Sequence, residues 1–249
     1  MPDIRIRNPS GILWALYASG PSKAGVLLPI GNCVVFDVMN KCFLTASHVL
    51  RAAPKRLKYA GVEIAPEFVC FMVGVRTDSA KLLRFEVVAH IEIVPEVTAL
   101  YLSSHSHTYN VPFPAEQSFQ PDSKPVDILW PVIMSGVPSS IQDFDIKPDQ
   151  DMMEMEYKMS TIHEYHISGM VSGCYRTSAP YFIDSNLLPV FVVDNAVLPG
   201  MSGCAVFRNI ANNHKIAGMV IKNITVGQKD ANGPEIVQTL CVCSSDIEV

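Results

Sequence analysis

The sequence has little charge, and it lacks both a dense basic region and a long apolar run. Asp, Glu, Lys and Arg make up 17% of the 249 residues, and the net charge is −5. A nucleic-acid surface needs clustered positive charge, and a membrane-spanning helix needs about 20 consecutive apolar residues. We therefore expect no nucleic-acid partner and no membrane partner, and we interpret the one basic run, residues 51–58, as a solvated loop.

A disulfide framework is also missing. The seven cysteines are an odd number, and their spacing follows no disulfide pattern. Cys241 and Cys243 would share one face of a strand, too far apart for an easy bridge. These features suit a reducing compartment, so we expect a cytoplasmic protein whose thiols are small core residues. We expect no metal and no cofactor, since His163 and His166 would point to opposite faces of a strand.

What the chain does have is a succession of short apolar segments separated by turn residues, the pattern of an antiparallel β protein. Between two such sets, residues 104–127 carry four prolines, should hold no regular structure, and contain His105 and His107 without a ligand. We therefore predict an all-β chain of two barrels, with the first in residues 1–112, a linker in 113–126 and the second in 127–249. The expected strands are 13–18 (retained, and not a signal peptide), 33–38, 42–45, 68–75, 83–93, 97–103, 128–134, 155–162, 166–174, 189–193, 204–207, 215–221 and 237–243.

Two short motifs carry the chemistry. Ser202 lies between Gly200-Met201 and Gly203, where the chain can turn sharply and expose backbone N–H groups. His48 follows an apolar segment that ends in Thr-Ala-Ser. A serine hydroxyl needs a neighbouring base to become a nucleophile, and histidine suits that task near neutral pH. The amides of Gly200 and Ser202, aimed at one point, would form an oxyanion hole worth about 3–4 kcal/mol per donor.

Both motifs resemble those of the chymotrypsin-like serine peptidases. Residues 43–49, Phe-Leu-Thr-Ala-Ser-His-Val, are similar to the family's hydrophobic-Thr-Ala-Ala-His motif, and residues 200–206, Gly-Met-Ser-Gly-Cys-Ala-Val, are similar to its Gly-Asp-Ser-Gly-Gly-Pro-Val block. The resemblance is to a cytosolic, disulfide-free type, because Val49 stands where secreted members usually have a cysteine. It implies two Greek-key barrels with the active site in the cleft between them, His48 in the first barrel and Ser202 in the second.

The same resemblance implies an acid that orients the histidine. The family places this acid first in an Asp-hydrophobic-x-hydrophobic-Leu strand, and the matching segment here begins with Glu96. Glutamate is one methylene longer than aspartate, so the supporting loop would have to retreat. Glu92 and Asp78 are nearby alternatives. Glu92 alternates with apolar neighbours, which is typical of an outward position on a strand.

Further positions follow from the resemblance. Ile221, Lys222 and Asn223 match the strand end that pairs with the main chain of a substrate. Ala196 matches the floor of the specificity pocket, with Val197 and Asn223 near its walls, and an uncharged floor disfavours a Lys or Arg preference. Met201 replaces the aspartate that pairs with a freed N-terminus in trypsin-type zymogens. The enzyme should therefore be competent as synthesised, or be gated by a regulatory partner protein or by loop ordering.

The sequence thus predicts a serine endopeptidase that acts on a protein or peptide substrate through an acyl-enzyme intermediate, as a regulator that cleaves one specific protein. Two alternatives remain open. Glu96, Met201 and Cys204 all depart from the family pattern, as they would in a catalytically silent peptide-binding module. The same machinery would also permit an esterase.

Overall fold

The computed structural model describes most of the chain. The described residues are 5–6, 8–17, 26–59, 69–77, 82–107, 111–114, 116–117, 120–138, 163–175, 190–210, 213–226 and 236–247. The predicted strand at 155–162 and the alternative acid Asp78 lie outside these ranges.

Six antiparallel strands close the first barrel in the order β2-β3-β4-β7-β6-β5. Apolar side chains from these strands fill its interior because alternate residues of a strand point inward. Leu13, Phe43, Phe85 and Leu100 are fully buried there. The strands are β2 (Ser10–Tyr17), β3 (Val26–Asp37), β4 (Cys42–Ala46), β5 (Cys70–Arg76), β6 (Leu82–Val94) and β7 (Val97–Leu102).

A second ring of six strands runs in the order β13-β10-β11-β12-β15-β14 and closes through pairing of β14 with β13. Met134, Phe191 and Val220 are fully buried in its core. The strands are β10 (Pro131–Gly136), β11 (Tyr165–Tyr175), β12 (Val190–Val193), β13 (Ala205–Ile210), β14 (Asn213–Val226) and β15 (Ile236–Cys243), and the 3-10 helix η2 (Ser244–Asp246) follows. The predicted fold class, an all-β double barrel of the chymotrypsin-like type, is confirmed.

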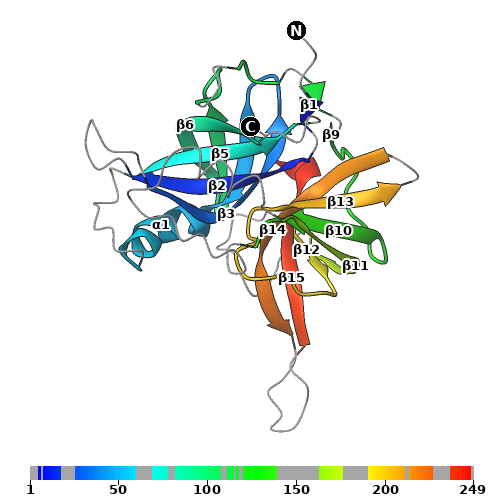
Figure 1. The fold of residues 1–249 in the computed structure, drawn as a ribbon. Coiled ribbons are helices and arrows are strands. Elements are labelled where there is room, and N and C mark those ends of the chain that lie inside the picture. Colours follow the sequence, from blue (N-terminus) through cyan, green and yellow to red (C-terminus); the bar gives the residue numbers. More distant parts are fainter. Residues whose placement is uncertain are drawn as a thin grey trace.

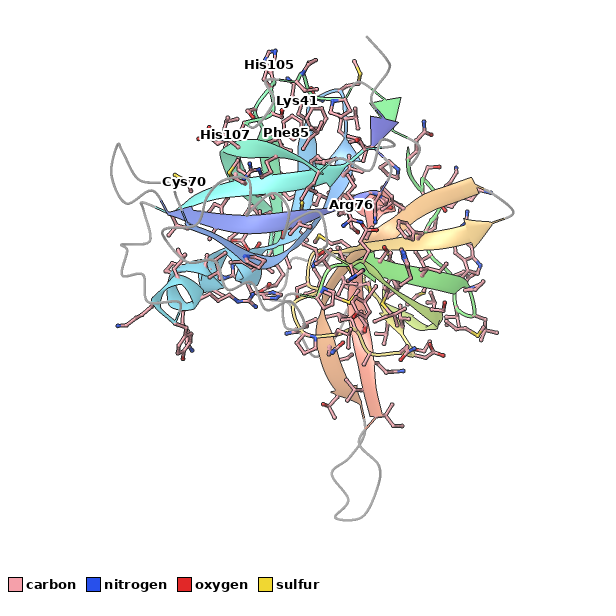
Figure 2. The ribbon with its side chains drawn as sticks, in the orientation of Figure 1. Lys41, Cys70, Arg76, Phe85, His105 and His107 are labelled. Atoms are coloured by element: carbon pink, nitrogen blue, oxygen red, sulfur yellow. The ribbon has the colours of Figure 1, made fainter. Side chains whose placement is uncertain are left out.

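The barrels lie side by side, and the β14–β15 ribbon extends beyond the second barrel (Figure 1). We call their contact the seam. At the seam, the Ser10 hydroxyl donates to the Ser135 carbonyl and accepts the Ala205 N–H at 2.9 Å. Arg76, which Figure 2 labels beside the second barrel, forms an ion pair with Glu164 at 3.6 Å. Buried hydrogen bonds of this kind fix two rigid barrels in one relative position.

The segment between the barrels is less irregular than the prolines indicate. It contains β8 (Glu116–Gln117), which pairs with β1 (Arg5–Ile6), and β9 (Gln120–Pro121), which pairs with β14. The division of the chain at residues 113–126 stays a prediction. His105 and His107 lie at the end of the first barrel remote from α1 (Figure 2).

One expectation was wrong: residues 51–58 are not a loop. They belong to α1 (Ser47–Tyr59), which packs on the outside of the first barrel (Figure 1). Val49, Leu50, Ala53 and Leu57 are buried, at the spacing of one helical face. Pro54 lies inside the helix, and a proline usually ends one, so the sequence concealed this element.

No disulfide joins any of the seven cysteines, all of which lie in the described part of the chain. Among the described residues, no helix has the length and apolar character that a bilayer crossing requires.

Candidate active site

His48 is the second residue of α1, directly after β4. The first turn of a helix leaves backbone N–H groups without partners inside the helix, and it attracts negative charge. Glu96 supplies both an acceptor and that charge from the turn between β6 and β7. Its carbonyl accepts the Ser47 N–H at 3.1 Å, and its carboxylate accepts the His48 N–H at 3.3 Å. The β6–β7 turn therefore caps the helix that carries the histidine.

The imidazole of His48 contacts the same carboxylate. Nδ1 lies 2.9 Å from Glu96 Oε2, a hydrogen-bond distance. When Nδ1 carries the proton and donates it to the carboxylate, Nε2 is left with a lone pair. The structure thus brings together the predicted base and the predicted acid, and it selects Glu96 over Glu92 as the partner of the ring.

The environment favours the ionised form of Glu96. Partial burial works to raise the pKa of its carboxyl, but the hydrogen bond to His48 and the charges of His48 and Arg51 outweigh that effect and hold the pKa below its usual value. An ionised acid is the form that can orient an imidazole and stabilise an imidazolium.

Ser202 lies in a tight turn of the second barrel between β12 and β13. Gly200 and Gly203 on either side have φ angles of 88° and 87°, a region that glycine enters at little cost. The Met201 N–H donates to the Leu198 carbonyl at 3.1 Å, and the Met201 carbonyl accepts the Cys204 N–H at 3.0 Å. The backbone on either side of Met201 is therefore fixed.

Asn32 of β3 ties this turn to the first barrel. Its backbone N–H donates to the Ser202 carbonyl at 3.0 Å, and its side-chain Nδ2 donates to the Gly200 carbonyl at 2.8 Å. The same side chain makes two bonds with the backbone of Val137, at 2.9 and 2.8 Å. Sequence reasoning missed Asn32, although a polar residue within the apolar segment 30–35 signals a buried hydrogen-bond network.

The residues that flank Ser202 and His48 meet at the seam. A Cβ atom on Gly203 would lie 2.9 Å from the hydroxyl of Thr45, three residues before His48. A Cβ atom on Gly31 would lie 2.7 Å from a methyl of Val49 and 3.3 Å from the Ser202 carbonyl. Within the described part of the chain, no hydrogen bond joins the Ser202 hydroxyl to the His48 ring. Catalytic hydrogen bonds are often long or poorly aligned before a substrate arrives.

The predicted oxyanion donors are Gly200 and Ser202. No acceptor among the described residues takes the backbone N–H of either one. Cys204 lies close by in sequence, but burial raises its pKa well above the usual value for a thiol, so it stays protonated. The side chain of Cys204 is buried, whereas that of Ser202 is partly exposed.

The predicted substrate-binding residues lie on two segments that hydrogen bonds hold together. The Asn223 side chain accepts the Val197 N–H at 3.1 Å and donates to the Val197 carbonyl at 2.8 Å. Ala196 is partly exposed beside this pair. Lys222 and Asn223 are exposed on β14, whereas the side chain of Ile221 is buried at a bulge in that strand. Lys222 and Asn223 are therefore the accessible part of this predicted segment.

Comparison with known proteins supports the fold. No protein-family model matches the chain, and a search of the curated proteins found no match. Among solved structures, the chain is similar to a crystal structure of the Rv3671c protease in an inactive form, with 14% sequence identity and a TM-score of 0.50. The match covers 97% of this chain and 86% of that chain. At this identity the likeness shows a shared protease-like double-barrel fold.

Proposed function

We propose that this protein is a serine endopeptidase that cleaves peptide bonds through Ser202, His48 and Glu96. The observation that carries the proposal is the 2.9 Å contact between His48 Nδ1 and Glu96 Oε2. Thr45, three residues before His48, also lies against Gly203, the residue that follows Ser202. A carboxylate on Nδ1 leaves Nε2 as the base, and a base beside a serine is what nucleophilic catalysis requires.

In the proposed reaction, the Ser202 hydroxyl attacks the peptide carbonyl while His48 Nε2 takes its proton. The N–H groups of Gly200 and Ser202 bind the oxygen that becomes negative. The tetrahedral intermediate then collapses, the leaving amine takes the proton from His48, and an acyl-enzyme remains. Water then attacks the ester carbonyl while His48 takes its proton, and His48 returns that proton to the Ser202 oxygen as the acid product leaves. Glu96 stays ionised throughout and stabilises the imidazolium.

The proposed substrate is a specific protein that is cut in the cytoplasm by limited proteolysis. The main chain of residues 221–223 would pair with the substrate, as in β-strand addition. Ala196, Val197 and Asn223 would border the side chain before the scissile bond, and all three are uncharged. Met201 is fully buried among apolar residues, which supports an enzyme that needs no N-terminal cleavage. The enzyme would then be competent as synthesised.

An active-site-directed fluorophosphonate tests the proposal without knowledge of the substrate. We expect the folded protein to be labelled on Ser202, and we expect labelling to vanish in Ser202→Ala and to fall by orders of magnitude in His48→Ala. Ser172→Ala, which removes an exposed serine from the same barrel, is the control and should label like the parent. Failure of the folded parent protein to label would favour the silent peptide-binding module, whereas cleavage of esters but of no protein would favour an esterase.

A further inference from the structure

Glu96 is held at both carboxylate oxygens. Oε2 faces His48, and Oε1 lies 2.5 Å from an Nη of Arg51. Arg51 stands three residues after His48 on α1, so both side chains project from the same face of the helix. The guanidinium is planar and carries several donors in a fixed arrangement, which lets it orient a carboxylate as well as attract it.

Arg51 is itself braced by a second acid. Its other Nη lies 3.2 Å from Oε1 of Glu92, and the same Glu92 oxygen accepts the backbone N–H of Glu96 at 3.1 Å. Glu92 therefore contacts both Arg51, which binds the Glu96 carboxylate, and the main chain of Glu96 itself. The charged groups that meet Glu96 are His48 and Arg51 from α1 and Glu92 from β6, and together they form one connected network.

The backbone at Glu96 explains why such bracing is needed. Its φ of 68° lies in the left-handed region, which a residue with a side chain rarely adopts. A strained conformation persists only where the surroundings fix it. Here both backbone groups of Glu96 are bonded, the N–H to Glu92 and the carbonyl to Ser47. Glutamate also has one more rotatable bond than aspartate, so the carboxylate needs a second contact to stay on the ring.

We propose that Arg51, braced by Glu92, is a positioning residue that fixes the Glu96 carboxylate against His48. This inference rests on the proposed function for its effect on catalysis, but its geometric content stands independently. The side chains of Arg51 and Glu92 are 55% and 45% exposed. Exposed ion pairs contribute little to folding and are screened by salt. The network should therefore affect the orientation of His48 far more than the stability of the barrel.

The test compares three variants. Arg51→Gln removes both the charge and the paired donors, and Arg51→Lys keeps the charge without them. Lys55→Gln removes an equal charge one turn further along the exposed side of α1 and serves as the control. We expect the rate constant for fluorophosphonate labelling of Ser202 to fall roughly ten- to hundredfold in Arg51→Gln, the range associated with misplaced catalytic groups. Arg51→Lys should be intermediate, Lys55→Gln should equal the parent, and all should unfold at the same urea concentration.

Two further readouts separate positioning from a structural role. Added salt should slow labelling of the parent by a neutral probe while leaving Arg51→Gln nearly unchanged, because only the parent has the ion pair to lose. The proton NMR signal of His48 Nδ1, which reports the bond to Glu96 directly, should shift or broaden in Arg51→Gln and be restored in part by Arg51→Lys.

The outcomes distinguish this inference from the proposed function. An unlabelled parent protein overturns the peptidase proposal, but a changed Nδ1 signal in Arg51→Gln would still support the positioning role. If the parent is labelled and Arg51→Gln labels within twofold of it, Arg51 does not position the acid. An Nδ1 signal that is identical in Arg51→Gln and the parent overturns the inference whether or not the protein is labelled.

Discussion

The two barrels hold their candidate catalytic residues in different ways. In the first barrel, His48 and Glu96 come from adjoining elements, and side-chain contacts join them directly. In the second barrel, Ser202 stands on a turn whose backbone is tied to a residue of the other barrel, Asn32. The candidate base and acid thus contact each other within one barrel, whereas the turn of the candidate nucleophile is bonded across the seam.

Because of this difference, substitutions at Glu96 and at Asn32 should have different effects on the reaction rate and on the free energy of unfolding. The contacts of Glu96 lie at a partly exposed helix start, where the loss of the charge weakens exposed ion pairs and uncovers little apolar surface. Asn32 is fully buried, and its bonds satisfy backbone groups of two separate segments, at Val137 and Gly200. Substitutions of His48 or Glu96 should therefore slow the reaction and leave the free energy of unfolding nearly unchanged. Substitutions at Asn32 should affect both.

The largest expected effect is on the reaction, from Glu96→Gln. An amide on Nδ1 can favour the wrong tautomer of His48, and in comparable triads such a change costs about 10⁴ in rate. We expect the labelling rate constant to fall by about 10³–10⁴, and the free energy of unfolding to change by less than about 1 kcal/mol. Stopped-flow labelling and urea denaturation measure the two quantities.

Glu86→Gln is the control for this change. It removes an equal charge from an exposed position on β6, the strand that leads into the turn of Glu96, and should behave as the parent protein does in both measurements. Full activity of Glu96→Gln would mean that another acid orients the ring, with Asp78 the candidate outside the described residues.

The second largest effect is expected from Asn32→Ala, which tests whether the turn of Ser202 depends on the contact between the barrels. Asn32→Ala leaves the buried backbone groups of Val137 and the Gly200 carbonyl without their side-chain partner, and an unsatisfied buried group costs about 1–3 kcal/mol. We expect the free energy of unfolding to fall by about 2–4 kcal/mol and labelling of Ser202 to slow in the fraction that stays folded. Chemical denaturation, followed by labelling under folding conditions, measures both.

Asn40→Ala is the matched control in the same barrel. Asn40 lies exposed in the turn after β3, where its side chain donates to the carboxylate of Asp37, its one side-chain hydrogen bond within the described ranges. Its loss should change stability by less than about 0.5 kcal/mol. Equal effects of Asn32→Ala and Asn40→Ala would show that the turn around Ser202 holds its shape without help from the first barrel.

The same contrast explains what the sequence could predict. Strands are encoded locally, so alternation and turn residues gave elements close to those observed, such as 42–45 for β4 (Cys42–Ala46). The motifs around His48, Glu96 and Ser202 are also local. Asn32 and Arg51 were missed because their roles arise from contacts between distant segments. The helix that presents Arg51 was concealed by Pro54 within its basic run.

The smallest expected effect is on the pH dependence of stability, and it concerns Glu96 in the first barrel. The pKa of Glu96 is lower in the folded protein than its ordinary value of 4.5, so its ionised form stabilises the fold. That stabilisation is complete above the ordinary value and is lost as the pH falls through the lower, folded-state value. The difference in unfolding free energy between the parent and Glu96→Gln should therefore shrink as the pH falls below about 4.5, by less than about 1 kcal/mol in all. Urea denaturation between pH 6 and pH 3 measures this difference, with Glu86→Gln correcting for the loss of one charge. A difference that stays constant or grows as the pH falls would mean that His48 and Arg51 do not favour the ionised carboxylate of Glu96. The contact between His48 and Glu96 would then hold the candidate base and acid together no better than the seam holds the turn of Ser202.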